Sequence, residues 1–323
     1  MGSGLAQLVR LLPPGRWCSG EQLARSLKIS RAAVWKQIER ARELGLPIRA
    51  ERGRGYRLDL PLELLSEPRM RDFGGAELAT LQQLEVVFET GSTNADLLAL
   101  PPSQAHARAR FAERQTAGRG RRGRRWHAAL GRSLCFSLGW RFEAGLGALA
   151  FLPLVTAIAV AEALEELGLA DHSIKWPNDI VVHPDKLAGC LLEVRGDVSG
   201  PCLAVLGVGL NIALDDEPGA LIDQPWTDLQ QQGLRLSRNH VAGALLTRLI
   251  GAVQQYDRHG FAPFEDAWKR WDGLSGKTVM VRAEDGTERS GVARGLGSRG
   301  GLLVHFADGE RECLAGEVSV RGG

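Results

Sequence analysis

The stretch Gln115–Trp126 reads Q-T-A-G-R-G-R-R-G-R-R-W and interleaves arginine with glycine. Its cationic and flexible positions are Arg119, Arg121, Arg122, Arg124, Arg125, Gly118, Gly120 and Gly123. The apolar segments on either side, around Phe111 and over Leu134–Leu138, are typical of strands. A buried core does not need so much positive charge on so flexible a backbone, whereas a loop that binds an anion uses both. We therefore interpret this stretch as an anion-binding loop between two strands.

The composition is that of a globular protein with several domains. A length of 323 residues predicts two or three domains, and 44% hydrophobic residues suffice for sizeable cores. We find no apolar run of the roughly 18 residues that suggest a membrane-spanning helix, and no signal-peptide layout, so we expect a cytoplasmic protein without membrane attachment. The five cysteines are scattered, which argues against a disulfide framework and a structural zinc site.

The charge is distributed unevenly along the chain. Residues 1–60 carry 12 Lys/Arg and 5 Asp/Glu, a net charge of +7, and the remainder carries a net charge of −5. A basic head on a mildly acidic body predicts that the N-terminal part binds a polyanion.

The first sixty residues predict a winged helix-turn-helix. Helical apolar spacing in residues 4–12 is followed by a second helix that begins after Ser19 and a third that begins after Ser30. Residues 48–58 then suggest a hairpin with a basic tip, the shape of a DNA-binding wing. A three-helix module for protein contacts is the alternative. We expect Trp35, on the third helix, to be a packing residue rather than a base contact.

The middle of the chain predicts a sheet with polar ends. A strand over residues 86–88 leads through Ser92 and Thr93 into a helix, and these hydroxyls suit either a helix cap or a polar ligand. Residues 173–182 require a backbone turn at the proline. Residues 186–194 and 203–212 read as strands, and residues 149–168 and 239–259 as helices. From residue 275 onward, short strands at 277–282, 288–296, 301–306 and 317–320 predict a small β-barrel.

The polar residues of this region point to chemistry on anions. A phosphate-binding loop of the G-x-x-x-x-G-K-[ST] type is absent. Arginines, lysines and amides are concentrated instead, and an Asp with an Asn can offer oxygen ligands to Mg²⁺. This inventory suits a site that brings a carboxylate and a nucleotide triphosphate together, because their repulsion must be neutralised. An arginine-glycine patch for nucleic acid is the alternative, which the regular flanking strands disfavour.

Four motifs in order give the chain a resemblance to the bacterial biotin–protein ligases that also repress the biotin operon. They are G-R-G-R-R-G-R-R-W (Gly118–Trp126), K-W-P-N-D (Lys175–Asp179), K-L-A-G (Lys186–Gly189) and G-V-G-L-N (Gly207–Asn211). The resemblance covers nearly the whole chain. It implies an α+β multidomain protein: a winged helix-turn-helix (residues 1–62), a linker (63–85), a mixed-sheet catalytic domain related to class II synthetases (86–273) and an SH3-like β-barrel (274–323).

The resemblance also implies an activity and partners. Biotin and MgATP form biotinyl-5′-AMP and pyrophosphate, and a lysine of the biotin carboxyl carrier protein of acetyl-CoA carboxylase then receives the biotin. The adenylate-bound protein forms a homodimer that represses the biotin operon by binding operator DNA. A biotin-sensing repressor without ligase activity, and a lipoate or octanoate ligase, are the alternatives.

The motif matches imply roles for individual residues. The implied biotin-binding residues are Ser92, Thr93, Asn94, Gln115, Arg119, Gly120, Arg121 and Lys186. The implied ATP- and adenylate-binding residues are Arg121, Arg122, Arg124, Trp126, Lys175, Asn178, Asp179 and Asn211. Arg121 and Lys186 are implied to be catalytic, and Asp179 and Asn211 to lie near Mg²⁺. On the basic N-terminal module, the candidate DNA-binding residues are Arg31, Lys36, Arg40, Arg52 and Arg54.

Overall fold

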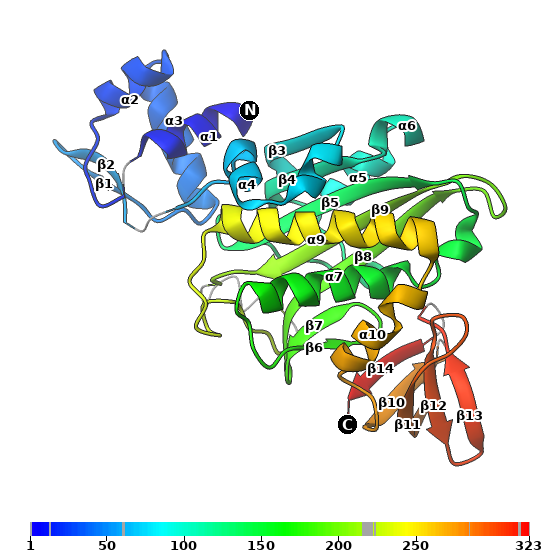
Figure 1. Ribbon diagram of the computed structural model, residues 1–323. Coiled ribbons are helices and arrows are strands. Elements are labelled where there is room, and N and C mark those ends of the chain that lie inside the picture. The colour runs from blue at the N-terminus through cyan, green and yellow to red at the C-terminus, as the bar shows by residue number, and fades with distance from the viewer. Residues whose placement is uncertain are drawn as a thin grey trace.

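A computed structural model shows three parts that follow one another along the chain (Figure 1). It describes residues 2–12, 14–59, 62–214, 222, 224–283, 285–315 and 318–322. A helical head is followed by a central sheet covered by helices and then by a small β domain. The architecture expected from the sequence is confirmed. The residue at which each domain begins and ends stays a prediction, and residues 60 and 61, beside the first boundary, lie outside the described ranges.

The head is a winged helix-turn-helix. Its elements are α1 (Gly2–Leu11), α2 (Gly20–Leu27), α3 (Arg31–Glu43), β1 (Ile48–Glu51) and β2 (Gly55–Leu58). Ser19 and Gln22 form the expected capping box at the start of α2, with Gln22 N donating to Ser19 Oγ at 3.1 Å. Ser30 caps α3 by accepting from Ala33 N, also at 3.1 Å. Local sequence therefore determines both helix starts.

One predicted packing residue of the head is largely exposed. Trp35, expected to pack rather than to contact bases, is 54% exposed. The buried positions of α3 are Val34, Ile38 and Ala41, which share one face of the helix. Trp35 follows Val34 by one residue and so points about 100° away from that face.

Residues 62–85, which include the predicted linker, pack against the central part of the chain. They contain α4 (Glu67–Phe73) and a 3₁₀ turn, η1 (Ala76–Thr80), and strand β3 begins at Gln83. Leu65, Met70 and Leu78 lie in the same hydrophobic cluster as the central sheet. The connection to the head therefore follows a fixed path over the sheet.

A buried ion pair fastens this connection. Arg238 donates to Glu113 Oε2 at 2.8 Å, and the two side chains are 4% and 3% exposed. The Arg238 guanidinium also donates to the carbonyls of Glu63 and Ser133, and the Leu65 N–H donates to the second Glu113 oxygen. Because a buried charge is costly unless it is paired and hydrogen-bonded, these contacts form one unit.

The central part is a mixed sheet of seven strands in the order β3-β4-β5-β9-β8-β7-β6. The strands are β3 (Gln83–Thr90), β4 (Arg108–Gln115), β5 (Ser133–Phe142), β6 (Ser173–Lys175), β7 (Asp179–Val182), β8 (Asp185–Gly196) and β9 (Cys202–Asn211). The first pair is parallel and the others are antiparallel. The expected turn at Pro177 separates β6 from β7 and contains a cis Trp176–Pro177 bond. The helices and 3₁₀ turns of the central part are α5 (Thr93–Leu98), α6 (Pro102–Ala105), η2 (Arg121–Gly123), η3 (Leu146–Leu149), α7 (Leu152–Glu166), α9 (Arg238–His259), η4 (Ala262–Phe264) and α10 (Glu265–Trp271).

Strand alternation gives the sheet two different faces. Leu134, Phe136 and Leu138 of β5 lie in the main core, which α7 and α9 cover side by side (Figure 1). Ser137 and Cys135, between them, point to the opposite face, where α5 packs and the polar residues gather. The candidate site is therefore on the face away from α7 and α9.

One helical segment of the described residues, Leu146–Glu166, is long and apolar enough to cross a membrane by length and composition, contrary to the expectation from the sequence. Most of α7 is fully buried against the sheet and α9. Its apolar composition is therefore explained by its place in the core.

The C-terminal part is a small antiparallel β domain. Its strand order is β13-β12-β11-β10-β14, with β10 (Thr278–Ala283), β11 (Glu288–Leu296), β12 (Leu302–Phe306), β13 (Gly309–Cys313) and β14 (Val318–Gly322). Strand β13 was not predicted, because its sequence G-E-R-E-C lacks apolar alternation. Residue 317, the first of the predicted last strand, lies outside the described residues.

Candidate active site

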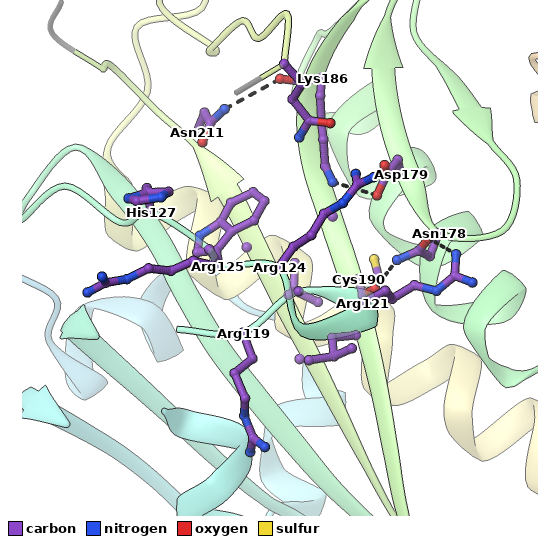
Figure 2. A pocket seen from close by; sticks show the side chains of 18 of the residues that line it. Arg119, Arg121, Arg124, Arg125, His127, Asn178, Asp179, Lys186, Cys190 and Asn211 are labelled. Carbon is purple, nitrogen blue, oxygen red and sulfur yellow. Dashed lines mark hydrogen bonds and ion pairs between the residues drawn. The ribbon is translucent and has the colours of Figure 1, made fainter. Parts of the chain in front are cut away.

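The arginine-glycine stretch forms a hairpin over the polar face of the sheet (Figure 2). Gly120 N donates to the carbonyl of Arg124 at 2.8 Å, and Trp126 N donates to the carbonyl of Gly118 at 2.9 Å. The tip turns through Arg122 and Gly123, whose φ angles are 55° and 72°. Glycine adopts such angles readily, which accounts for Gly123.

The hairpin closes over a cavity of about 760 Å³. All the residues predicted to bind biotin or nucleotide line it: Ser92, Thr93, Asn94, Gln115, Arg119, Gly120, Arg121, Arg122, Arg124, Trp126, Lys175, Asn178, Asp179, Lys186 and Asn211. They come from segments more than a hundred residues apart in the sequence. The fold therefore brings the predicted residues together, while the role of each one stays a prediction.

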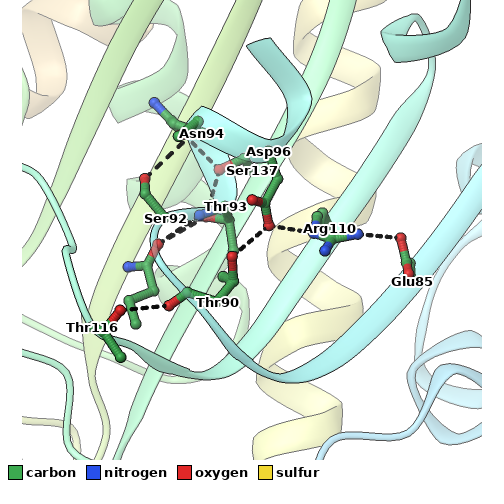
Figure 3. Close-up of polar contacts among 11 residues, drawn as sticks. Glu85, Thr90, Ser92, Thr93, Asn94, Asp96, Arg110, Thr116 and Ser137 are labelled. Atoms are coloured by element: carbon green, nitrogen blue, oxygen red, sulfur yellow. Dashed lines mark hydrogen bonds and ion pairs between the residues drawn. The ribbon is translucent and has the colours of Figure 1, made fainter. Parts of the chain in front are cut away.

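One end of the cavity is a compact polar cluster at the start of α5 (Figure 3). Gln115 Oε1 accepts from the backbone N–H of Thr93 at 2.8 Å, and Ser137 Oγ lies 2.7 Å from Thr93 Oγ1. Asn94 Oδ1 accepts from the Ser137 hydroxyl. Thr93, Asn94 and Ser137 are all at most 3% exposed. Such a cluster can bind a small ligand rich in N–H and C=O groups.

A second polar network holds α5 in place from outside the cavity. Asp96 accepts from Thr90 Oγ1 at 2.7 Å and from Arg110 Nε at 2.6 Å, and Arg110 also pairs with Glu85 at 2.5 Å (Figure 3). Ser92 caps the helix, with Ala95 N donating to its hydroxyl. Ser92 therefore caps α5 and also lines the cavity, so the two roles expected for it are compatible.

Arg121, at the hairpin tip, is anchored at both ends of its guanidinium. One nitrogen donates to Asn178 Oδ1 at 3.1 Å and the other to the backbone carbonyl of Ala315, beyond the last residue of β13. Asn178 in turn donates to the carbonyl of Cys190. Burial lowers the pKa of Arg121, and the nearby Asp179 carboxylate opposes that shift. Arg121 therefore presents a positive charge whose position is fixed.

Lys186 and Asp179 form an ion pair inside the cavity at 2.8 Å. The Lys186 ammonium also lies 5.7 Å from the centre of the Trp126 ring. A carboxylate and an aromatic face position the ammonium, so the lysine is not simply solvated. It is placed to meet an anionic group entering the cavity.

Two glycines of β9 make room for these side chains. A Cβ on Gly209 would lie 2.4 Å from Trp126 Cε2, and one on Gly207 would lie 2.4 Å from Asn94 Oδ1. The glycines of the motif G-V-G-L-N are therefore required sterically, because the side chains of Trp126 and Asn94 lie directly against the backbone of β9.

Asn211 and Asp179 are the candidate oxygen ligands for a metal. Asn211 Nδ2 donates to the carbonyl of Thr227 at 3.0 Å, while its buried Oδ1 lacks a partner within the described part of the chain. The described part of the chain contains no group of three or more His, Cys, Asp or Glu able to hold a metal. One carboxylate and one free amide oxygen fit Mg²⁺ that arrives with its own phosphate ligands.

Sequence reasoning missed several residues of the site. Cavity-lining residues without a predicted role include Arg125, His127, Trp176, Cys190, Leu191, Gln224 and Trp226. Glu193 and Ser137, which contact the predicted biotin residues from behind, were also missed. Burial raises the pKa of Cys190 to about 12, so this thiol stays protonated and is a poor nucleophile at neutral pH.

The candidate DNA-binding residues lie in the head and do not line this cavity. Arg31, Lys36 and Arg40 are exposed on α3, and Arg52 and Arg54 are exposed at the tip of the β1–β2 hairpin. Arg54 lies 4.6 Å above the ring of Trp17 and pairs with Glu51 at 3.1 Å.

Comparisons with known proteins also separate the N-terminal head from the part that contains the cavity. The model of the biotin/lipoate A/B protein ligase family matches residues 89–211, and a model of a helix-turn-helix domain matches residues 5–57. The bifunctional ligase/repressor BirA of Escherichia coli is 35% identical over 98% of this chain and 96% of its own length. The biotin--[acetyl-CoA-carboxylase] ligase of Mycobacterium tuberculosis is 34% identical over 73% of this chain and 88% of its own.

A solved structure extends the likeness to the fold. The biotin protein ligase of Aquifex aeolicus in complex with biotin and ATP matches with a TM-score of 0.63 and 28% identity, over 75% of this chain and all of that one. The chain therefore belongs to the biotin protein ligase family, on the side of the bifunctional ligase/repressor proteins that carry an N-terminal helix-turn-helix domain.

Proposed function

We propose that this protein activates biotin with ATP to biotinyl-5′-AMP and pyrophosphate, and then transfers biotin to a lysine of the biotin carboxyl carrier protein of acetyl-CoA carboxylase. One observation carries the proposal. The arginine hairpin, the Lys186–Asp179 pair and the polar cluster around Thr93 line a single cavity. That cavity offers hydrogen bonds at one end and positive charge at the other, as a ligand with a polar head and a carboxylate tail requires.

In the first half-reaction a biotin carboxylate oxygen attacks the α-phosphorus of ATP, and the bond from that phosphorus to pyrophosphate breaks. Both reactants are anions, so the site must offset their repulsion before they can approach. Arg121 and Lys186 provide fixed positive charge for this purpose, and the polar cluster around Thr93 holds the other end of biotin. In the second half-reaction the carrier lysine amine attacks the acyl carbon, and AMP leaves.

Magnesium would enter as MgATP, with Asp179 and Asn211 on the protein side. Its chemistry when bound is to neutralise phosphate charge. Asp179 is already paired with Lys186. Asp179 would therefore hold the metal complex while it stays paired with the lysine.

We propose further that the protein represses the biotin operon as an adenylate-bound homodimer and works in the cytoplasm. The exposed cations of α3 and of the hairpin tip support contact with DNA phosphates. Such contacts set affinity and register rather than sequence preference.

The transfer step tests the ligase proposal. Purified protein, biotin, ATP and apo carrier protein should yield carrier with one biotin on a single lysine, detected by intact mass and peptide mapping. Omitting ATP is the control. Carrier that stays unmodified while biotin and operator DNA still bind would favour the alternative of a repressor without ligase activity.

A further inference from the structure

The structure assigns Glu193 and Ser137 a positioning role: through Asn94 they set the direction of the hydrogen bonds at the polar end of the cavity, and so the affinity for the head of biotin. This inference rests on the proposed function. Neither residue lines the cavity among the described residues, and both contact residues that do. They therefore act through their neighbours and do not touch the ligand.

Glu193, on β8, bridges two elements. Its Oε2 accepts from Asn94 Nδ2 at 2.8 Å, and its Oε1 pairs with Arg119 of the arginine hairpin at 3.2 Å. The carboxylate thus ties the hairpin to the start of α5. Its side chain is only 23% exposed, so the pair is partly shielded from water.

An ionised carboxylate only accepts hydrogen bonds, which determines how Asn94 is oriented. The NH₂ group of Asn94 must face Glu193, where the carbonyl of Leu191 accepts from the same nitrogen at 3.3 Å. Its carbonyl oxygen must then face Ser137 Oγ, over the bare backbone of Gly207. A flipped amide would oppose two oxygens on one side and is excluded.

Ser137 passes this donor-to-acceptor direction on to Thr93. A hydroxyl has one hydrogen, and Asn94 Oδ1 can only accept, so the Ser137 hydrogen is committed to Asn94. The Thr93 hydroxyl, 2.7 Å from Ser137 Oγ, must then supply the hydrogen of that contact. Thr93 lines the cavity, and its Oγ1 can then offer only lone pairs to a ligand.

An acceptor at this point suits an N–H group of the ligand. The ureido ring of biotin has two N–H groups and one carbonyl, so it binds only where acceptors and donors are in the right places. A pocket whose hydroxyls can reverse their hydrogens loses part of that selectivity. Glu193 prevents this reversal at the far end of the hydrogen-bond chain, which runs through Asn94 and Ser137 to Thr93.

The test compares Glu193→Gln with wild type and with Glu89→Gln. Gln fills the same space as Glu but cannot hold Arg119 by charge and can turn an NH₂ group toward Asn94. Glu89 pairs with Arg114 away from the cavity and is the matched control. We expect the KM for biotin in pyrophosphate–ATP exchange to rise about 10- to 100-fold, the weight of a hydrogen bond to a charged group, with the KM for ATP nearly unchanged. Glu89→Gln should behave as wild type.

Ser137→Ala provides a second route to the same answer. It breaks the chain of hydrogen bonds between Asn94 and Thr93 and leaves the Glu193–Arg119 pair in place, so it should raise the same KM selectively. In Ser137→Ala, the further change Glu193→Gln should raise the KM less than it does in wild type, because both act through Asn94.

Three outcomes overturn the inference: a KM for biotin within about twofold of wild type in both variants, an equal rise in the KM for ATP, or fully additive effects. Wild-type protein that shows no biotin-dependent exchange at all overturns the proposed function together with this inference. Normal wild-type exchange with unaffected variants removes this inference alone.

Discussion

Replacing Arg121 by alanine should slow adenylate formation about a thousandfold. The guanidinium is fixed at both ends, by Asn178 Oδ1 at 3.1 Å and by the Ala315 carbonyl, before any substrate arrives. Removing one preorganised donor of this kind typically lowers kcat by about 10²- to 10³-fold. The truncation also leaves the buried Asn178 oxygen without its donor, which moves the expectation to the upper end, about 4 kcal/mol of lost transition-state stabilisation.

Arg121→Lys separates charge from geometry. Lysine keeps the positive charge but offers a compact ammonium that cannot reach both anchors at once, so it should restore only about tenfold of the loss. Arg114→Ala removes an arginine whose partner, Glu89, lies away from the cavity, and it should exchange within about twofold of wild type.

The assay is biotin-dependent pyrophosphate–ATP exchange at saturating substrates, with thermal unfolding to confirm that each variant is folded. A folded Arg121→Ala that exchanges within about tenfold of wild type refutes the electrostatic role of this residue. An Arg121→Lys variant that is fully active refutes the argument from two anchors.

The other predictions concern packing, stability and the head. Gly209→Ala puts a methyl group 2.4 Å from the Trp126 ring, so it should lower the free energy of unfolding by about 1–3 kcal/mol and, by displacing that ring, lower kcat/KM for ATP; an unchanged urea midpoint together with unchanged kinetics contradicts this. Glu113→Gln should lower the free energy of unfolding by about 3 kcal/mol, because it leaves the buried Arg238 charge unpaired, and urea denaturation that shows no loss counts against the buried pair. Deleting residues 1–60 should abolish operator binding and spare most ligation, and the operator affinity of the full chain should fall steeply with salt in gel-shift titrations. Operator binding retained by the truncated protein would show that the DNA-binding residues lie elsewhere.

The sequence predicts those features of the protein that are determined by residues close to one another in the chain. Ser19 and Ser30 cap their helices by accepting a hydrogen bond from the backbone N–H three residues further along the chain. The arginine-glycine stretch predicts its own charge and its own turn. The motif matches identify fifteen residues that line the cavity, although other lining residues, such as His127 and Trp226, were missed.

Contacts that depend on strand register could not be predicted from the sequence. Glu193 and Ser137 meet Asn94 because β8, β9 and β5 pair in one particular register, and single-strand patterns do not state that register. The anchor of Arg121 on Ala315 joins positions 194 residues apart in sequence. Neither contact leaves a local signal.

Two other features, the exposure of Trp35 and strand β13, do have signals in the sequence. The spacing of Val34, Ile38 and Ala41 already implies that Trp35 points away from the core, so its exposure was predictable. The charged strand β13 was missed because an edge strand with solvated side chains has little apolar alternation.

The most direct test of the central claim is pyrophosphate–ATP exchange by the full-length protein with biotin, octanoate or lipoate as the carboxylate. We expect exchange with biotin, and little with the two fatty acids, which lack a ureido head for the cluster around Thr93. Exchange with octanoate or lipoate but not with biotin would assign the cavity to a different acid, and exchange with none of the three would contradict the claim that this cavity activates a carboxylate.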